Sequence, residues 1–146
     1  MLTGTGRPAC EVKTLTERRI SPMTVIATCH CGGTRIELDA APTPATACTC
    51  TYCSKVGALW SYHPLAEVRV VSEAYPGIYS KSGFNEHHFC ARCGITTHAI
   101  TPDYTEADIG KDTMPTGKRM SVNVRLLDDV DVGALPVSVI DGRNLW

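Results

Sequence analysis

The stretch Cys48-Thr-Cys-Thr-Tyr-Cys53 places three cysteines within six residues. We call Cys48, Cys50 and Cys53 the central triplet. Two further pairs flank it, an upstream pair in Cys29-His-Cys31 and a downstream pair in Cys90-Ala-Arg-Cys93. Seven of the eight cysteines therefore lie in three short clusters. Because structural zinc takes four protein ligands and catalytic zinc takes three plus an open position, seven cysteines match one site of each kind.

The cysteines could also form a disulfide framework or a redox-active C-x2-C pair. Eight cysteines in 146 residues fall below the roughly 8–10% that is typical of disulfide scaffolds. Spacings of C-x-C and C-x2-C are also poorly suited to disulfides between distant parts of a chain. In a reducing compartment such spacings indicate a metal site. The sequence therefore predicts two Zn²⁺ ions per chain.

Length and charge narrow the class of protein. A chain of 146 residues is expected to form one domain, and its 14 basic and 15 acidic residues include no basic run. This balance disfavours nucleic-acid binding. No apolar run approaches the roughly 18 residues of a membrane span, and the N-terminus lacks the apolar core of a secretory signal. We expect a cytoplasmic protein that contacts neither membrane nor nucleic acid, and the sequence does not indicate its oligomeric state.

Residues 1–22 differ from the rest of the chain. They show no clear periodicity, and Cys10 lies among them, away from every cluster. Polar termini without apolar patterning are usually poorly ordered. We expect 1–22 to be a disordered leader or extension, Cys10 to be no ligand, and 23–146 to be the zinc-binding domain.

Residues 23–146 show the pattern of short strands. Alternation of polar and apolar residues, bounded by Gly and Pro, predicts strands near 24–27, 35–39, 67–73, 77–81, 95–100, 120–126 and 137–140. The central triplet is expected in a tight turn, and 54–61 is ambiguous between a short helix and a strand. Residues 101–118 read as a surface loop. The predicted fold class is mainly β, a single domain of short antiparallel strands.

Spacing alone leaves two ways to divide the seven sulfur ligands. The two C-x2-C units, Cys50/Cys53 and Cys90/Cys93, could pair as a zinc ribbon. Alternatively, the upstream and downstream pairs could share one zinc and leave the central triplet as a contiguous three-thiolate site. The second division is stereochemically simpler, because all three ligands of the smaller site then come from one loop.

The same stretches resemble the glutathione-dependent formaldehyde-activating enzyme family, which includes centromere-protein-V-like proteins. The resemblance rests on 29–33 (CHCGG), 48–53 (CTCTYC), 88–94 (HFCARCG), 121–131 (SVNV, then LDDVD) and 140–144 (IDGRN). It implies a zinc-containing β-tent fold. It also implies a structural zinc held by Cys29, Cys31, Cys90 and Cys93, and a catalytic zinc held by Cys48, Cys50 and Cys53.

The function that the resemblance implies is that of a carbon–sulfur lyase. Its partners would be a small thiol, for which glutathione is one candidate, and an aldehyde such as formaldehyde. Three thiolates and Zn²⁺ carry a net charge of −1, which suits holding a substrate thiolate better than activating water. The alternative is a non-catalytic, zinc-stabilised module that binds a protein partner.

Histidine and aromatic side chains are secondary candidates. His30 separates the two residues of the upstream pair, and His87, His88 and His98 lie near the downstream pair. For each of them a structural or solvent-exposed role is the more common one. Three aromatic side chains could wall a pocket near the open zinc position, although aromatic residues at such places more often belong to the core: Tyr52, Trp60 and Tyr62.

Overall fold

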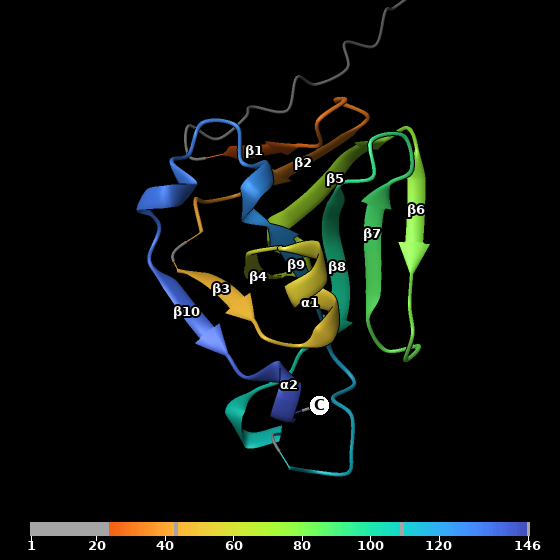
Figure 1. The fold of residues 1–146 in the computed structure, drawn as a ribbon, viewed down its shortest axis with the longest axis vertical. Helices are drawn as coiled ribbons and strands as arrows, with labels where there is room; N and C mark the ends of the chain where they lie inside the picture. Colours follow the sequence, from red (N-terminus) through yellow and green to blue (C-terminus); the bar gives the residue numbers. More distant parts are fainter. Residues whose placement is uncertain (1–23, 43, 109, 146) are drawn as a thin grey trace, which may run out of the picture.

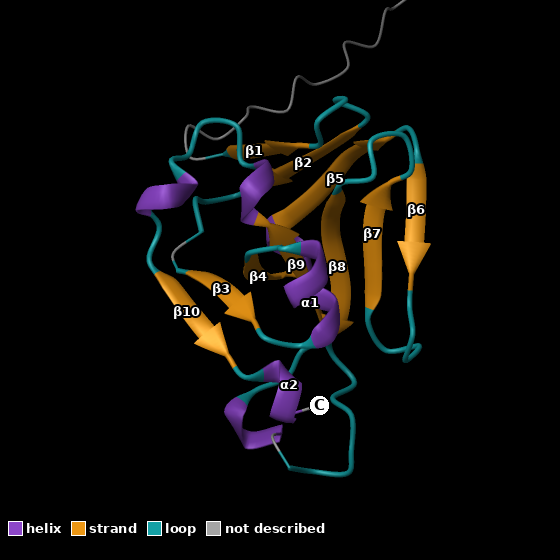
Figure 2. Ribbon diagram, viewed as in Figure 1, coloured by secondary structure: helices purple, strands orange, loops and turns teal. Residues whose placement is uncertain are grey.

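The computed structural model describes residues 24–42, 44–108 and 110–145. The predictions for 1–22 and Cys10 lie outside the described residues. Within them the chain forms two β-sheets and a few short helices, so the prediction of a mainly β fold is confirmed (Figures 1 and 2). No helix in the described part of the chain has both the length and the apolar character needed to cross a bilayer.

The smaller sheet has three antiparallel strands, β1 (Val25–Thr28), β2 (Thr34–Leu38) and β5 (Val68–Glu73), with β2 in the middle. Period-two patterning explains β2. Thr34, Ile36 and Leu38 are fully buried, whereas the side chains between them are only partly covered. This sheet therefore presents one apolar face to the rest of the molecule.

The larger sheet has seven strands in the order β10-β3-β4-β9-β8-β7-β6. Its pairs are antiparallel except β10 with β3, which run parallel. The strand bounds are Ala45–Cys48 (β3), Trp60–Pro64 (β4), Pro76–Tyr79 (β6), Glu86–Cys90 (β7), Thr96–Pro102 (β8), Lys118–Asn123 (β9) and Val137–Ile140 (β10).

The main core lies between the two sheets. Ile36 and Leu38 of β2 belong to it together with Val122 of β9 and Val124, and all four are fully buried. The other face of the large sheet carries the helix α1 (Thr51–Val56), which lies in front of β8 and β9 in Figure 1. A second, smaller cluster of buried residues forms there, and it contains two cysteines of the central triplet.

The sequence predicts a tight turn for the central triplet, and this prediction is wrong. Cys48 ends β3, and α1 begins immediately after Cys50. The Cys50 thiol caps the helix by accepting a hydrogen bond from the Cys53 backbone N–H. Gly57 ends the helix in the left-handed region, at φ 67°. The ambiguous segment 54–61 is thus helix up to Val56 and strand from Trp60.

The sequence also predicts a turn at Pro76-Gly77 between the strands near 67–73 and 77–81. In the structure both residues belong to β6, and the bend lies at 74–75. Gly77 is required in the strand because a Cβ there would lie 2.5 Å from the Phe89 ring. The remaining helical segments are single turns: Leu65–Glu67 (η1), Glu106–Asp108 (η2), Val124–Leu126 (η3), Val132–Ala134 (η4) and Gly142–Leu145 (α2).

Candidate metal centres

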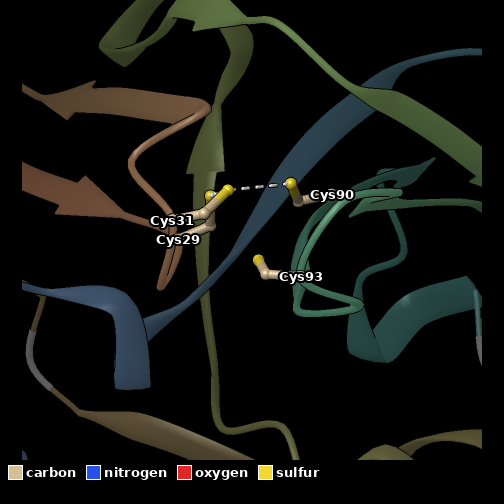
Figure 3. A group of neighbouring side chains, drawn as sticks. All are labelled: Cys29, Cys31, Cys90 and Cys93. Atoms are coloured by element: carbon tan, nitrogen blue, oxygen red, sulfur yellow. Dashed lines mark hydrogen bonds between the residues drawn. The ribbon is translucent and has the colours of Figure 1, made fainter.

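The upstream and downstream pairs face one another (Figure 3). Cys29 and Cys31 lie on the turn between β1 and β2, and Cys90 ends β7 just before the turn that carries Cys93. Their four sulfur atoms lie within 4.8 Å of one another. The structure thus has the second of the two divisions that spacing allowed, and we call these four residues the four-cysteine cluster.

The sulfur separations in this cluster fit a tetrahedral zinc site. The Cys29 and Cys31 Sγ atoms are 3.7 Å apart, and those of Cys31 and Cys90 are 3.6 Å apart. A Zn–S bond of about 2.3 Å places the sulfurs of a tetrahedral site about 3.8 Å apart. A disulfide would need about 2.05 Å. The residues present can therefore hold zinc.

The local backbone explains how short turns present two sulfurs each. Gly32 and Gly94 adopt φ values of 76° and 75°, where a side chain would be strained. The Thr34 N–H donates to Cys29 Sγ over 3.2 Å. Burial opposes ionisation of Cys93, but backbone N–H groups of Cys31 and Ile95 outweigh it and lower the pKa of this thiol to about 6. Such N–H groups stabilise thiolate, the form that binds metal.

The three sulfurs of the central triplet also lie within 4.8 Å of one another. Each accepts one N–H. Cys50 N–H donates to Cys48 Sγ (3.5 Å), Cys53 N–H to Cys50 Sγ (3.4 Å), and Trp60 Nε1–H to Cys53 Sγ (3.2 Å). Among the residues that the structure describes, no further His, Cys, Asp or Glu joins this group. A tetrahedral zinc held here would keep one position free of protein ligands.

Without a metal, burial would favour the uncharged thiol at Cys48 and Cys53, whose pKa values it raises, whereas hydrogen bonds lower the pKa of Cys50. Burial raises the pKa of Cys53 far above its ordinary value of 9.0, although the Trp60 N–H opposes the shift. A buried thiolate needs a positive partner. A Zn²⁺ ion supplies that charge, so the donor set fits zinc.

Aromatic side chains surround the central triplet. Tyr52 of α1 stacks on His87 at a centroid distance of 3.8 Å and on Tyr79 at 5.8 Å. Trp60 and Tyr62 pack in the same cluster as the cysteines. Burial lowers the pKa of His87, which keeps its imidazole neutral near pH 7. The secondary aromatic candidates are therefore brought to this site, together with His87.

His88 and His98 lie on the opposite face of the sheet. With Glu73 they form a third group of possible metal ligands, whose atoms lie within 4.8 Å of one another. The two imidazoles stack at 4.2 Å with an interplanar angle of 19°. Because stacked rings direct their nitrogen lone pairs along parallel planes, the two cannot bind one ion in this arrangement. His98 Nδ1 lies 3.0 Å from Thr97 Oγ1, and burial lowers its pKa to about 3.

Two other side chains near the clusters are His30, which the sequence analysis named, and Arg119, which it did not. His30 is exposed and lines a shallow hollow with Val56 and Arg125. Sequence reasoning missed Arg119, whose guanidinium carbon lies 4.1 Å from the Tyr62 ring centroid. Arg119 is the first residue of the alternating polar and apolar pattern 119–123. Its contact with Tyr62 could be recognised only from the pairing of β4 with β9.

Comparisons with known proteins were made by sequence and by structure. The chain matches no model of a protein family, and it matches no curated protein. A crystal structure of a Rhodobacter sphaeroides protein, a structural genomics target, superimposes with a TM-score of 0.57. The two sequences are 31% identical over 77% of this chain and 99% of the other.

The chain belongs to the same family as this Rhodobacter sphaeroides protein. An alignment that spans nearly the whole Rhodobacter sphaeroides protein shows that the likeness is not confined to one motif.

Proposed function

We propose that this protein is a zinc-dependent carbon–sulfur lyase of the formaldehyde-activating type. It would form or cleave the S-hydroxymethyl-type adduct of a small thiol and an aldehyde. The observation that carries the proposal is the central triplet, with three sulfurs gathered beside an aromatic wall and no fourth protein donor among the described residues. The resemblance in the cysteine stretches supports the same reaction class.

Two zinc ions per chain would have different roles, one structural and one catalytic. The four-cysteine cluster supplies a full tetrahedral set and is suited to a structural ion. The central triplet is suited to the catalytic ion. Zinc bound there would supply an open position at which a substrate thiol is held as thiolate at neutral pH.

The reaction is the addition of a thiol to an aldehyde. A bond forms between the thiol sulfur and the carbonyl carbon, the π electrons of the C=O bond move to oxygen, and the proton lost by the thiol ends on that oxygen. Cleavage is the reverse. No oxidant or reductant is needed, so the site requires only a thiolate, an aldehyde and a source of protons.

The chain's own residues would orient the thiol and limit its contact with water. Trp60 Nε1–H fixes Cys53 and withdraws charge from its sulfur. Tyr52 and His87 stack into a flat, uncharged wall. Thr49 Oγ1–H donates to Asp141 over 3.0 Å, which joins the loop between Cys48 and Cys50 to the C-terminal segment. These contacts hold the triplet in place around an open position.

The test is cobalt substitution of the purified protein. Thiolate-to-cobalt charge-transfer bands report each added sulfur, so titration with small thiols, glutathione included, should raise the band of the triplet site only. Formaldehyde added next should diminish that band as the hemithioacetal forms. A triplet site with four protein ligands and no response to any thiol would refute the lyase.

A non-catalytic module that binds a protein partner is the second candidate. It is favoured by apolar side chains on the two edge strands of the large sheet. Val139 of β10 is 70% exposed, and Ile78 of β6 is 59% exposed. The cobalt experiment separates the two functions, because a purely structural second site would not bind added thiols.

A further inference from the structure

A row of polar side chains lies on the face of the large sheet that carries the central triplet. Tyr62 of β4 is paired with Ser121 of β9, and Ser121 with Ala99 of β8. Two residues from Ser121 on β9, Arg119 is paired with Thr101 of β8. Side chains two residues apart on a strand share a face, so these residues share the face of Tyr62. We call Thr101, Arg119 and Ser121 the Arg119 patch.

The three side chains of the Arg119 patch each hold a buried polar atom that lacks a hydrogen-bond partner among the described residues: Thr101 Oγ1, Arg119 Nε and Ser121 Oγ. Ser121 is only 2% exposed. Buried polar groups are normally paired, because leaving one unpaired loses the hydrogen bonds that it would make with water in the unfolded chain. Three such groups side by side are therefore unusual, and all three can donate a hydrogen bond.

The guanidinium of Arg119 is held in place but not neutralised. It lies over the Tyr62 ring at 4.1 Å, a cation–π contact. Its nearest carboxylate is Asp103, with Nη1 and Oδ1 3.9 Å apart, too far for a hydrogen bond. Asp103 is itself more than half exposed, so water screens this pair. Arg119 therefore keeps both its positive charge and free N–H donors.

Strand β4 joins the patch to the central triplet. Trp60 donates to Cys53 Sγ, and Tyr62 follows two residues later on the same strand, about 7 Å along. Tyr62 packs in the cluster that contains the triplet, and its ring also carries the Arg119 guanidinium. A small thiol held at the open position could thus extend along Tyr62 toward Arg119.

We propose that the Arg119 patch is the subsite for a carboxylate of the substrate, so that the thiol handled by the central triplet is a small mercaptocarboxylate. The guanidinium carries a positive charge and supplies only donors, and the two hydroxyls can donate as well, which favours a carboxylate over an amine or a neutral hydroxyl group. This inference rests on the proposed function, because it assumes that a thiol binds at the triplet.

The experiment measures thiol binding to the cobalt-substituted protein by its charge-transfer band. Three thiols of similar length are compared: 3-mercaptopropionate, 2-mercaptoethanol and 2-aminoethanethiol. We expect 3-mercaptopropionate to bind about tenfold or more tightly than 2-mercaptoethanol, and the amine to bind weakest, in line with the strength of hydrogen bonds between charged groups. The comparison needs no variant, so it cannot fail through misfolding.

Two variants assign the preference to Arg119. Arg119→Gln should abolish the preference for the carboxylate by weakening the binding of 3-mercaptopropionate alone. Arg119→Lys should keep only part of the preference, because lysine cannot form the bidentate contact of a guanidinium. Arg35→Gln is the matched control. It removes one positive charge from β2 of the small sheet, where Arg35 pairs with Glu37, and should change nothing.

Each outcome is decisive. Equal affinity of the wild type for the three thiols overturns the subsite but leaves the lyase intact. Equal weakening of 3-mercaptopropionate and 2-mercaptoethanol by Arg119→Gln also overturns it, since Arg119 would then only support Tyr62. If no thiol perturbs the cobalt spectrum, the proposed function itself fails and the subsite fails with it.

Discussion

Losing one ligand should affect the two cysteine clusters unequally. Cys31 and Cys90 are separated by 59 residues, so a metal in the four-cysteine cluster closes a long loop, whereas Cys48 and Cys53 share one short loop. Loop-closure entropy grows as (3/2)RT ln n, and a tenfold longer loop therefore gives a difference of about 2 kcal/mol. Cys29 and Cys90 also belong to the main core. Cys93→Ser should accordingly destabilise the fold more than Cys50→Ser.

The expected measurements are melting temperature and zinc content. For a chain of this size, about 2 kcal/mol corresponds to a melting temperature at least about 6 °C lower for Cys93→Ser than for Cys50→Ser. If Cys93→Ser loses its metal altogether, it should be unfolded, because structural zinc contributes about 10 kcal/mol or more in zinc-finger peptides. Cys50→Ser should fold with one zinc, and the wild type should hold two. Equal melting temperatures for the two variants would refute the division into a structural and a catalytic site.

Three further predictions concern single groups. Trp60→Phe removes the N–H that reaches Cys53 Sγ but keeps an aromatic ring, so zinc affinity of the central triplet should fall about 10–100-fold in a chelator competition; an equal loss from the four-cysteine cluster would contradict this. Burial lowers the pKa of His98 from 6.5 to about 3, so between these values the unfolded chain binds one more proton and the free energy of unfolding falls as pH falls. Denaturant unfolding from pH 7.5 to 5.5 should show that the free energy of unfolding of the wild type falls, with a slope approaching about 1.4 kcal/mol per pH unit, and that His98→Gln lacks this fall. If the two proteins show parallel pH dependences, His98 is not the cause. Removal of residues 1–22 should leave melting temperature and zinc content unchanged, and a drop of several degrees would show that this segment packs on the domain.

The three cysteine clusters and the strands could be predicted from sequence because both depend on local spacing, whereas spacing left two ways to divide the clusters between two metal sites. Short C-x-C and C-x2-C units can only present two sulfurs to one point, which leaves few combinations. Alternation in the segment 34–38 directly marks a strand that is buried on one face. These features need no knowledge of which strands are neighbours.

The helix after Cys50 and the Arg119 patch could not be predicted in this way. Six residues are too few for a helical period, and the cap at Cys50 is a thiol instead of the usual Ser, Thr, Asp or Asn. Arg119 comes to the site only because β4 pairs with β9 in a register that sets it diagonally across from Tyr62. Register is a long-range property, and a shift of one residue would turn this side chain to the other face.

The parallel pairing of β10 with β3 determines when each metal site can be completed during synthesis. All four ligands of the four-cysteine cluster have been made once residue 93 is joined to the chain. The central triplet is made earlier still, but β3 gains its outer neighbour only with 137–140, and Thr49 gains its partner only with Asp141. Because chains fold progressively from the N-terminus as they are synthesised, the loop around the triplet is the last part to become enclosed. A metal at the triplet would therefore reach its final surroundings only after 137–141 have been made.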